Sequence, residues 1–233
     1  MGFIGVQPAT VPLTANDITD GIISTAKIAD DAVDNTKLDL TANYAFTGTV
    51  TGASSGLVKL LSATWSSAVA EYDITNSIIT STFDDYLITW RIQPSTDSTE
   101  LRLRFSTDGG STFDSGSNYG YELQNHANNV TSTNNGGTYI PLSYTNLGNA
   151  SGEISNGYLY LHDANSTTFP TTILGQATGY NNGANHNGFI FSGGQIYSAR
   201  TNNVDGLRFA TASGNLEIGR ITVYGITKWQ DIN

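Results

Sequence analysis

Two hydrophobic patterns divide the chain near Gly52. From there to the C-terminus, apolar and polar residues alternate in short runs, which is typical of strands with one buried face. The clearest run is 100–106, in which leucine and phenylalanine positions alternate with two arginines. We expect strands within this run and within residues 55–63, 63–74, 84–94, 157–163, 171–180, 188–199, 205–210 and 216–226.

Turn-forming glycine, asparagine, serine and aspartate residues separate these runs, and no segment keeps a convincing helical period. About eight to ten short strands at such spacing are typical of an antiparallel sandwich. The sequence therefore predicts an all-β protein. We expect residues 53–233 to form a jelly-roll-like β-sandwich, preceded by an extended N-terminal anchor or stalk in residues 1–52.

The N-terminal pattern is different, because between residues 18 and 38 an aliphatic residue returns at every fifth position. This period fits neither a helix nor a strand. Three copies around one axis could bury these side chains, whereas a single chain could not close a core with them. We expect oligomerisation, as a homotrimer, or docking on a partner; a solvated linker is the alternative. The predicted contacts are Ile18, Ile23, Ile28, Val33 and Leu38.

Composition narrows the possible partners. Charged residues make up 13% of the chain and the net charge is −10, which argues against binding to nucleic acid or to an anionic membrane. The absence of cysteine excludes disulfides and thiolate chemistry. No apolar stretch approaches the length of a membrane-spanning helix, and the first residues lack the pattern of a signal peptide.

The N-terminal sequence resembles a known family. Residues 6–40, VQPATVPLTANDITDGIISTAKIADDAVDNTKLDL, followed by YAFTGTVTG, resemble the N-terminal segments of fibre-like structural proteins of tailed bacteriophages. YLITWRI, LRLRFSTDGG and GNLEIGRITVYGI, further on, are similar to the small β-sandwich domains of phage tail and head appendages. The chain is shorter than long tail fibres and lacks their extended shaft.

The resemblance implies a non-enzymatic protein on the surface of the virion. Its N-terminus would dock on other virion proteins, and its sandwich would contact a host-surface glycan, as a short tail fibre or appendage does. Three alternatives remain open: a capsid decoration or cement protein, a depolymerase that cuts host polysaccharide, and a secreted lectin without a virion.

Residues 106–113, STDGGSTF, match the Asp-box pattern S-x-D-x-G-x-x-[WF]. We expect the side chains of Ser106 and Asp108 to form hydrogen bonds within a turn. Gly110 should adopt a backbone conformation that glycine tolerates, and the Phe113 ring should pack beneath the turn. The motif occurs once, without the repeat that a propeller requires. It therefore predicts a turn that stabilises a hairpin.

Candidate catalytic and metal-binding groups form no recognisable motif. The carboxylates at positions 84, 85, 108, 114 and 122 could form a glycosidase pair, but their separation cannot be read from the sequence. Asp97, Asp108 and Asp114 lack the dense ligand series of a calcium loop, and the three histidines lack metal-ligand spacing. We expect no catalytic residue, metal or cofactor.

Three asparagine-rich loops, 125–137, 179–188 and 200–206, are the candidate glycan contacts. Amides beside aromatic rings suit sugar hydroxyls and ring faces. Asparagine and glycine are equally common in turns that bind nothing. The candidate residues are Asn125, His126, Asn128, Tyr180, Asn181, His186 and Arg200.

Overall fold

The computed structural model describes residues 56–126, 130–196, 199 and 202–227. The predicted anchor in residues 1–52, with Ile18, Ile23, Ile28, Val33 and Leu38, lies outside the described residues. The expected boundary between the anchor and the sandwich lies outside them as well.

The described part of the chain contains twelve strands. They are β1 (Leu57–Trp65), β2 (Glu71–Ile74), β3 (Asp85–Pro94), β4 (Leu101–Ser106), β5 (Tyr119–Asn125), β6 (Val130–Gly137), β7 (Ile140–Pro141), β8 (Ser155–His162), β9 (Thr172–Tyr180), β10 (His186–Gln195), β11 (Gly206–Thr211) and β12 (Leu216–Ile226). Within these residues, no helix is long and apolar enough to cross a membrane.

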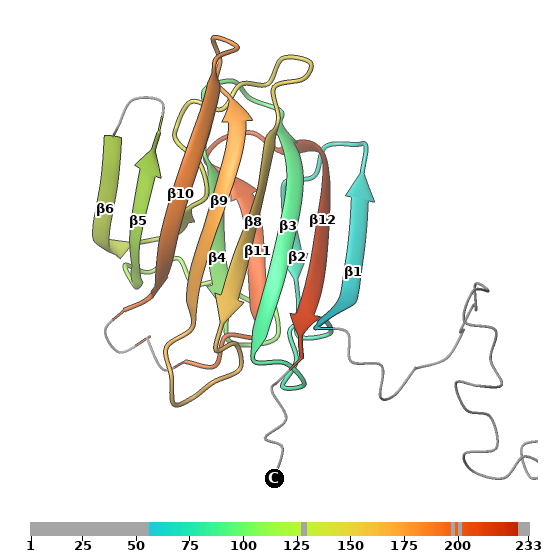
Figure 1. The fold of residues 1–233 in the computed structure, drawn as a ribbon, viewed down its shortest axis with the longest axis vertical. Coiled ribbons are helices and arrows are strands. Elements are labelled where there is room, and N and C mark those ends of the chain that lie inside the picture. Colours follow the sequence, from blue (N-terminus) through green and yellow to red (C-terminus); the bar gives the residue numbers. More distant parts are fainter. Residues whose placement is uncertain (1–55, 127–129, 197–198, 200–201, 228–233) are drawn as a thin grey trace, which may run out of the picture. The chain divides into compact units, whose positions relative to one another are not determined.

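The strands form two antiparallel sheets, as Figure 1 shows. The large sheet has the order β1-β12-β3-β8-β9-β10-β5-β6, and the small sheet has the order β2-β11-β4-β7. Strands β1 to β4 alternate between the sheets, as do β7, β8, β11 and β12. This is the strand order of a jelly roll, to which β9, β10, β5 and β6 add four strands at one side of the large sheet. The all-β, jelly-roll-like fold expected from the sequence is confirmed.

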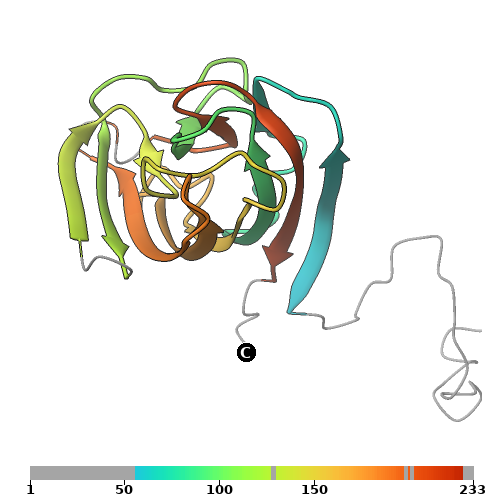
Figure 2. The same cartoon turned by 90° about the horizontal axis from the view of Figure 1, so that it is seen from above.

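The core lies between the two sheets and is rich in aromatic side chains. The Trp90 indole, from β3 of the large sheet, lies 6.1 Å from the ring of Phe191 and 5.8 Å from the ring of Phe209, measured between centroids. Phe209 belongs to β11 of the small sheet, so these contacts join the layers. The large sheet also curves, so that β5 and β10 lie beside β7 (Figure 2).

The predicted β4 alternation is confirmed, because Leu101, Leu103 and Phe105 are fully buried. The loop predicted at 125–137 is largely a strand instead, because β6 covers Val130–Gly137. Its sequence, VTSTNNGG, has no apolar alternation. It is a strand because its backbone pairs with β5, and backbone hydrogen bonds do not depend on hydrophobic pattern. The strands β5 and β7 were likewise missing from the sequence-based prediction.

Candidate functional site

The fold brings only some of the predicted glycan-contact residues close together. Tyr180 and His186 are directly opposite each other on β9 and β10, and their rings meet edge to face with centroids 5.8 Å apart. Asn181 follows Tyr180, but its side-chain oxygen accepts the backbone N–H groups of Gly183 and Asn185. Asn181 therefore stabilises the β9–β10 turn.

The other predicted contacts do not join this pair. Asn125 is fully buried, with 0% of its surface exposed, so its side chain is not accessible to a ligand. His126 is exposed at the end of β5, where its backbone N–H donates to the carbonyl of Gly188. Asn128 and Arg200 lie outside the described residues.

The Asp-box segment forms the tight turn that its sequence indicates. The Asp108 carboxylate accepts hydrogen bonds from the hydroxyl and the backbone N–H of Thr112, at 2.7 and 2.8 Å, and from the Ser106 hydroxyl at 2.8 Å. Gly109 and Gly110 have positive φ angles of 77° and 90°, which glycine adopts without strain. The three donors lower the pKa of Asp108 to about 2, with the Thr112 hydroxyl contributing most.

This turn is attached to the small sheet by two further contacts. The Gly109 N–H donates to the carboxylate of Asp205, just before β11. The ring of Phe113 lies 4.1 Å from the guanidinium of Arg208, on β11, and that guanidinium is bound through two 2.7 Å hydrogen bonds to Asp73 of β2. The carboxylates of Asp108, Asp205 and Asp73 are all taken up by hydrogen bonds within this cluster, which indicates a structural role.

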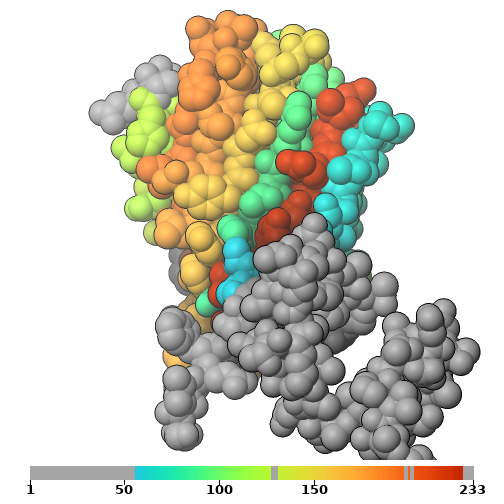
Figure 3. Space-filling view, turned by 45° about the vertical axis from the view of Figure 1, so that its right-hand side comes forward, coloured from blue at the N-terminus to red at the C-terminus, as the bar shows by residue number. Residues whose placement is uncertain are grey.

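A different surface has the features of a binding site: the outer face of the large sheet, turned away from the small sheet. Figure 3 shows β9, β8, β3 and β12 as neighbouring bands on this face. Along β8, Leu159 and Leu161 are fully buried in the core. Because side chains alternate along a strand, the intervening Tyr158, Tyr160 and His162 lie on the outer face. We call these three residues the aromatic row.

The rings of the aromatic row contact one another in sequence. Tyr158 and Tyr160 meet edge to face with centroids 6.2 Å apart, and Tyr160 stacks on His162 at 5.9 Å with planes inclined by 15°. The His162 Nδ1 atom lies 3.2 Å from a carboxylate oxygen of Asp85, on β3. The rings therefore support one another, and Tyr158 leaves 38% of its surface exposed.

Side chains opposite the aromatic row extend it across the sheet. Tyr158 is opposite Gln176 on β9, and Tyr160 is opposite Leu174, which is 53% exposed. Ser192 of β10 and Glu122 of β5 continue the line from Leu174. The result is a strip in which apolar surface alternates with hydroxyl, amide and carboxylate groups.

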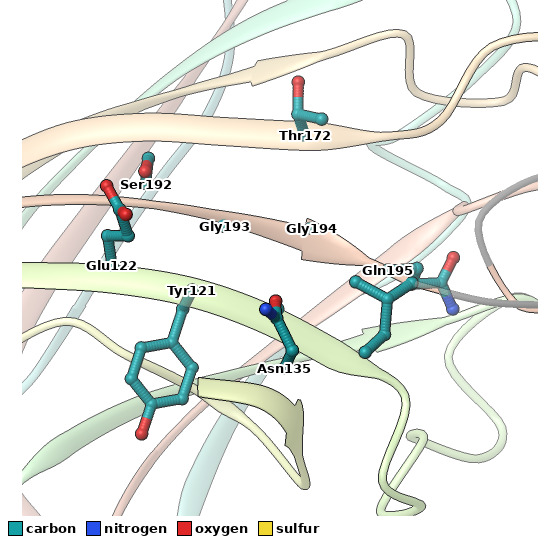
Figure 4. A pocket seen from close by; sticks show the side chains of 10 residues that line it. Tyr121, Glu122, Asn135, Thr172, Ser192, Gly193, Gly194 and Gln195 are labelled. Carbon is teal, nitrogen blue, oxygen red and sulfur yellow. The ribbon is translucent and has the colours of Figure 1, made fainter. Parts of the chain in front are cut away.

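The strip ends at a shallow pocket of about 300 Å³ between β5, β9 and β10. Figure 4 shows Glu122 and Ser192 on one side of these strands and Tyr121 on the other. Gly120 and Gly194 are directly opposite each other on the pocket floor. The space that a side chain would take at Gly120 is filled by Ile196 and Asn135, and at Gly194 by Thr171 and Thr172, so the pocket is shallow.

Flat rings beside amides and hydroxyls can bind the C–H faces and hydroxyls of a sugar. In the residues that the structure describes, no cluster of three or more histidine or acidic side chains could hold a metal ion. Comparisons of the chain with protein-family models, curated proteins and solved structures found no match. Only the geometry of its residues therefore indicates that the outer face of the large sheet binds a ligand.

Sequence analysis missed the aromatic row, although its signal was present. The strand GYLYLHD was identified by its alternation, but the alternation does not say which of its two faces is buried. A tyrosine side chain is compatible with either the buried or the exposed face. The two leucines of this strand pack between the sheets, and the opposite face, which carries the tyrosines, is therefore exposed.

Proposed function

We propose that this chain is a non-enzymatic structural protein of a tailed-phage virion, a short tail fibre or appendage that contacts a host-surface glycan through its β-sandwich. The observation that carries the glycan contact is the aromatic row, Tyr158, Tyr160 and His162, on the outer face of the large sheet. Burying part of an exposed tyrosine against a sugar ring is favourable because apolar surface leaves water. The likeness of residues 6–40 to phage fibre proteins supports the virion assignment.

An aromatic row on a rigid strand suits a saccharide better than an apolar protein partner. Successive outward side chains are about 7 Å apart along a strand, so the rings form a spaced row that an extended saccharide could follow. Leu174 and Gln176 on β9 widen the row, so that a chain of several sugars would contact two strands. We propose that this wider contact is the host-binding surface.

Binding of the full-length chain to an array of bacterial surface polysaccharides tests the glycan contact. We expect Tyr158→Ala and Tyr160→Ala each to weaken binding about tenfold, the loss expected when a stacked aromatic worth about 1–1.5 kcal/mol is removed. Phe169→Ala is the matched control, because Phe169 is an aromatic residue 61% exposed in the β8–β9 loop and is not part of the row. Binding that is unchanged in both tyrosine variants, or no binding to any glycan, would overturn the proposed contact.

The role of residues 1–52 needs a separate measurement, namely the molar mass of the full-length protein beside a chain that starts at Gly52. We expect a trimer for the full-length protein and a monomer for the truncated one. Trimers in both would place the trimer contact in the sandwich and favour the capsid decoration protein. Monomers in both would refute the homotrimer.

A further inference from the structure

Two arginines face each other on the outer face of the large sheet. Arg91 on β3 and Arg220 on β12 are direct cross-strand partners, and both are exposed. Thr64 of β1 and Asn156 of β8 continue the same line on either side. Four neighbouring strands therefore present two guanidinium groups between a hydroxyl and an amide.

Like charges directly opposite each other destabilise a sheet, and no carboxylate among the described residues neutralises this pair. In the described part of the chain, neither Arg91 nor Arg220 forms an ion pair, whereas Arg102 and Arg208 are each bound by a carboxylate. The lack of a carboxylate partner for Arg91 and Arg220 is notable, because the chain has 20 acidic residues and only 10 lysines and arginines. A ligand with a negative charge would relieve the repulsion.

The two guanidinium groups line a pocket of about 360 Å³ whose other walls suit a sugar ring. Ile218, 38% exposed, provides apolar surface. The Trp65 indole lies on the other side of β12, over Gly219, where it stacks on Tyr72 with centroids 5.1 Å apart and donates its N–H to the Leu216 carbonyl. The Gln93 amide is also held, by the backbone carbonyls of Asn149 and Ala150.

We infer that this pocket binds the carboxylate of an acidic saccharide, such as a uronic acid, between Arg91 and Arg220, with the sugar ring against Ile218. Guanidinium groups bind carboxylates through paired, charge-assisted hydrogen bonds. A carboxylated glycan, with a charge only on some sugars, suits this chain better than a densely sulfated polymer, because the net charge of −10 repels a continuous polyanion.

This inference rests on the proposed function, because it names the chemical class of the glycan. The pocket and the aromatic row lie on one surface: Asn156, opposite Arg91, is two residues from Tyr158 on β8 and points to the same side. A single saccharide chain could therefore place an acidic sugar in the pocket and neutral sugars on the row.

The test uses the full-length chain with oligosaccharides that carry one galacturonate or glucuronate among neutral sugars, and with the same oligosaccharides after reduction of the carboxyl group to an alcohol. We expect at least one acidic oligosaccharide to bind about tenfold more tightly than its reduced form, and the difference to shrink with added salt. Arg91→Gln and Arg220→Gln should remove the difference. Arg104→Gln is the matched control, since Arg104 is on the small sheet and donates to the Thr138 carbonyl.

The outcomes separate the two proposals. Equal affinity for acidic and reduced forms, with both weakened by Tyr158→Ala, would overturn the carboxylate pocket and leave the aromatic row in place. Acidic binding that is lost in Arg91→Gln but unaffected by Tyr158→Ala would support the pocket and refute the aromatic row. A loss in Arg104→Gln as large as in Arg91→Gln would overturn the pocket, because general charge attraction would then explain the affinity.

Discussion

Gly157 of β8 makes room for Trp90 of β3. The two residues are direct cross-strand partners, and a Cβ atom at position 157 would overlap the six-membered ring of the indole. Trp90 is 96% buried, with 4% of its surface exposed, and it touches aromatic rings of both sheets. The bare backbone of one strand thus allows the central tryptophan to lie flat across it.

We therefore expect Gly157→Ala to destabilise the sandwich by about 1–3 kcal/mol, the usual cost of overpacking a tight core. Urea unfolding followed by tryptophan fluorescence measures the change. Gly188→Ala on β10 is the control, because a Cβ atom there meets nothing within 4 Å. Similar unfolding midpoints for the Gly157 variant and the wild type would contradict the close packing.

The Asp108 turn should respond to acid. Its folded-state pKa of about 2 lies below the ordinary value of 3.8, so the charged carboxylate stabilises the fold above pH 4. That contribution is lost as the pH falls through about 2. We expect Asp108→Asn to lower the thermal midpoint at pH 7 and to lower it by less at pH 2, where about half of the folded-state carboxylate is protonated. A deficit as large at pH 2 as at pH 7 would mean that the charge of Asp108 is irrelevant to the turn.

Tyr119 should respond to alkali. Its buried hydroxyl accepts the Phe105 N–H at 2.9 Å and donates to the Asp114 carbonyl at 3.1 Å, and burial raises its pKa well above 10.0. Because the folded-state pKa is raised, the stability contributed by the neutral phenol is complete below pH 10 and is lost as the pH rises beyond it.

Tyr119→Phe leaves the buried Phe105 N–H without its acceptor, so we expect a loss of about 1–3 kcal/mol at pH 7. The variant should also lose less stability than the wild type between pH 9 and 11. Tyr158→Phe serves as the control, since Tyr158 is 38% exposed on the outer face. Urea unfolding at the three pH values measures both effects, and parallel alkaline losses in Tyr119→Phe and the wild type would argue against Tyr119 as the titrating group.

The pair of Arg91 and Arg220 predicts a stabilising substitution. Because like charges opposite each other cost stability, Arg220→Gln should raise the free energy of unfolding by about 0.2–1 kcal/mol at low salt. The gain should decrease near 1 M salt, where the screening length falls to about 3 Å. Arg104→Gln should give no such salt-dependent gain. A destabilised Arg220→Gln would indicate that this guanidinium has a stabilising role in the unliganded fold.

The sequence by itself determined the features that depend on neighbouring residues. The alternation in residues 100–106 predicted which side chains of β4 are buried, because successive side chains of any strand point to opposite faces. The turn at Ser106–Phe113 was also predicted, because most of its hydrogen bonds join residues within the motif.

Tertiary structure decided the features that depend on strand pairing. The polar segment Val130–Gly137 became a strand because β5 supplied hydrogen-bond partners, and Asn125 was buried by the layer it faces. Arg91 and Arg220 are far apart in the sequence and become neighbours only because β12 inserts between β1 and β3. Local alternation gives each strand two faces, but only the pairing of distant strands decides which side chains share a surface.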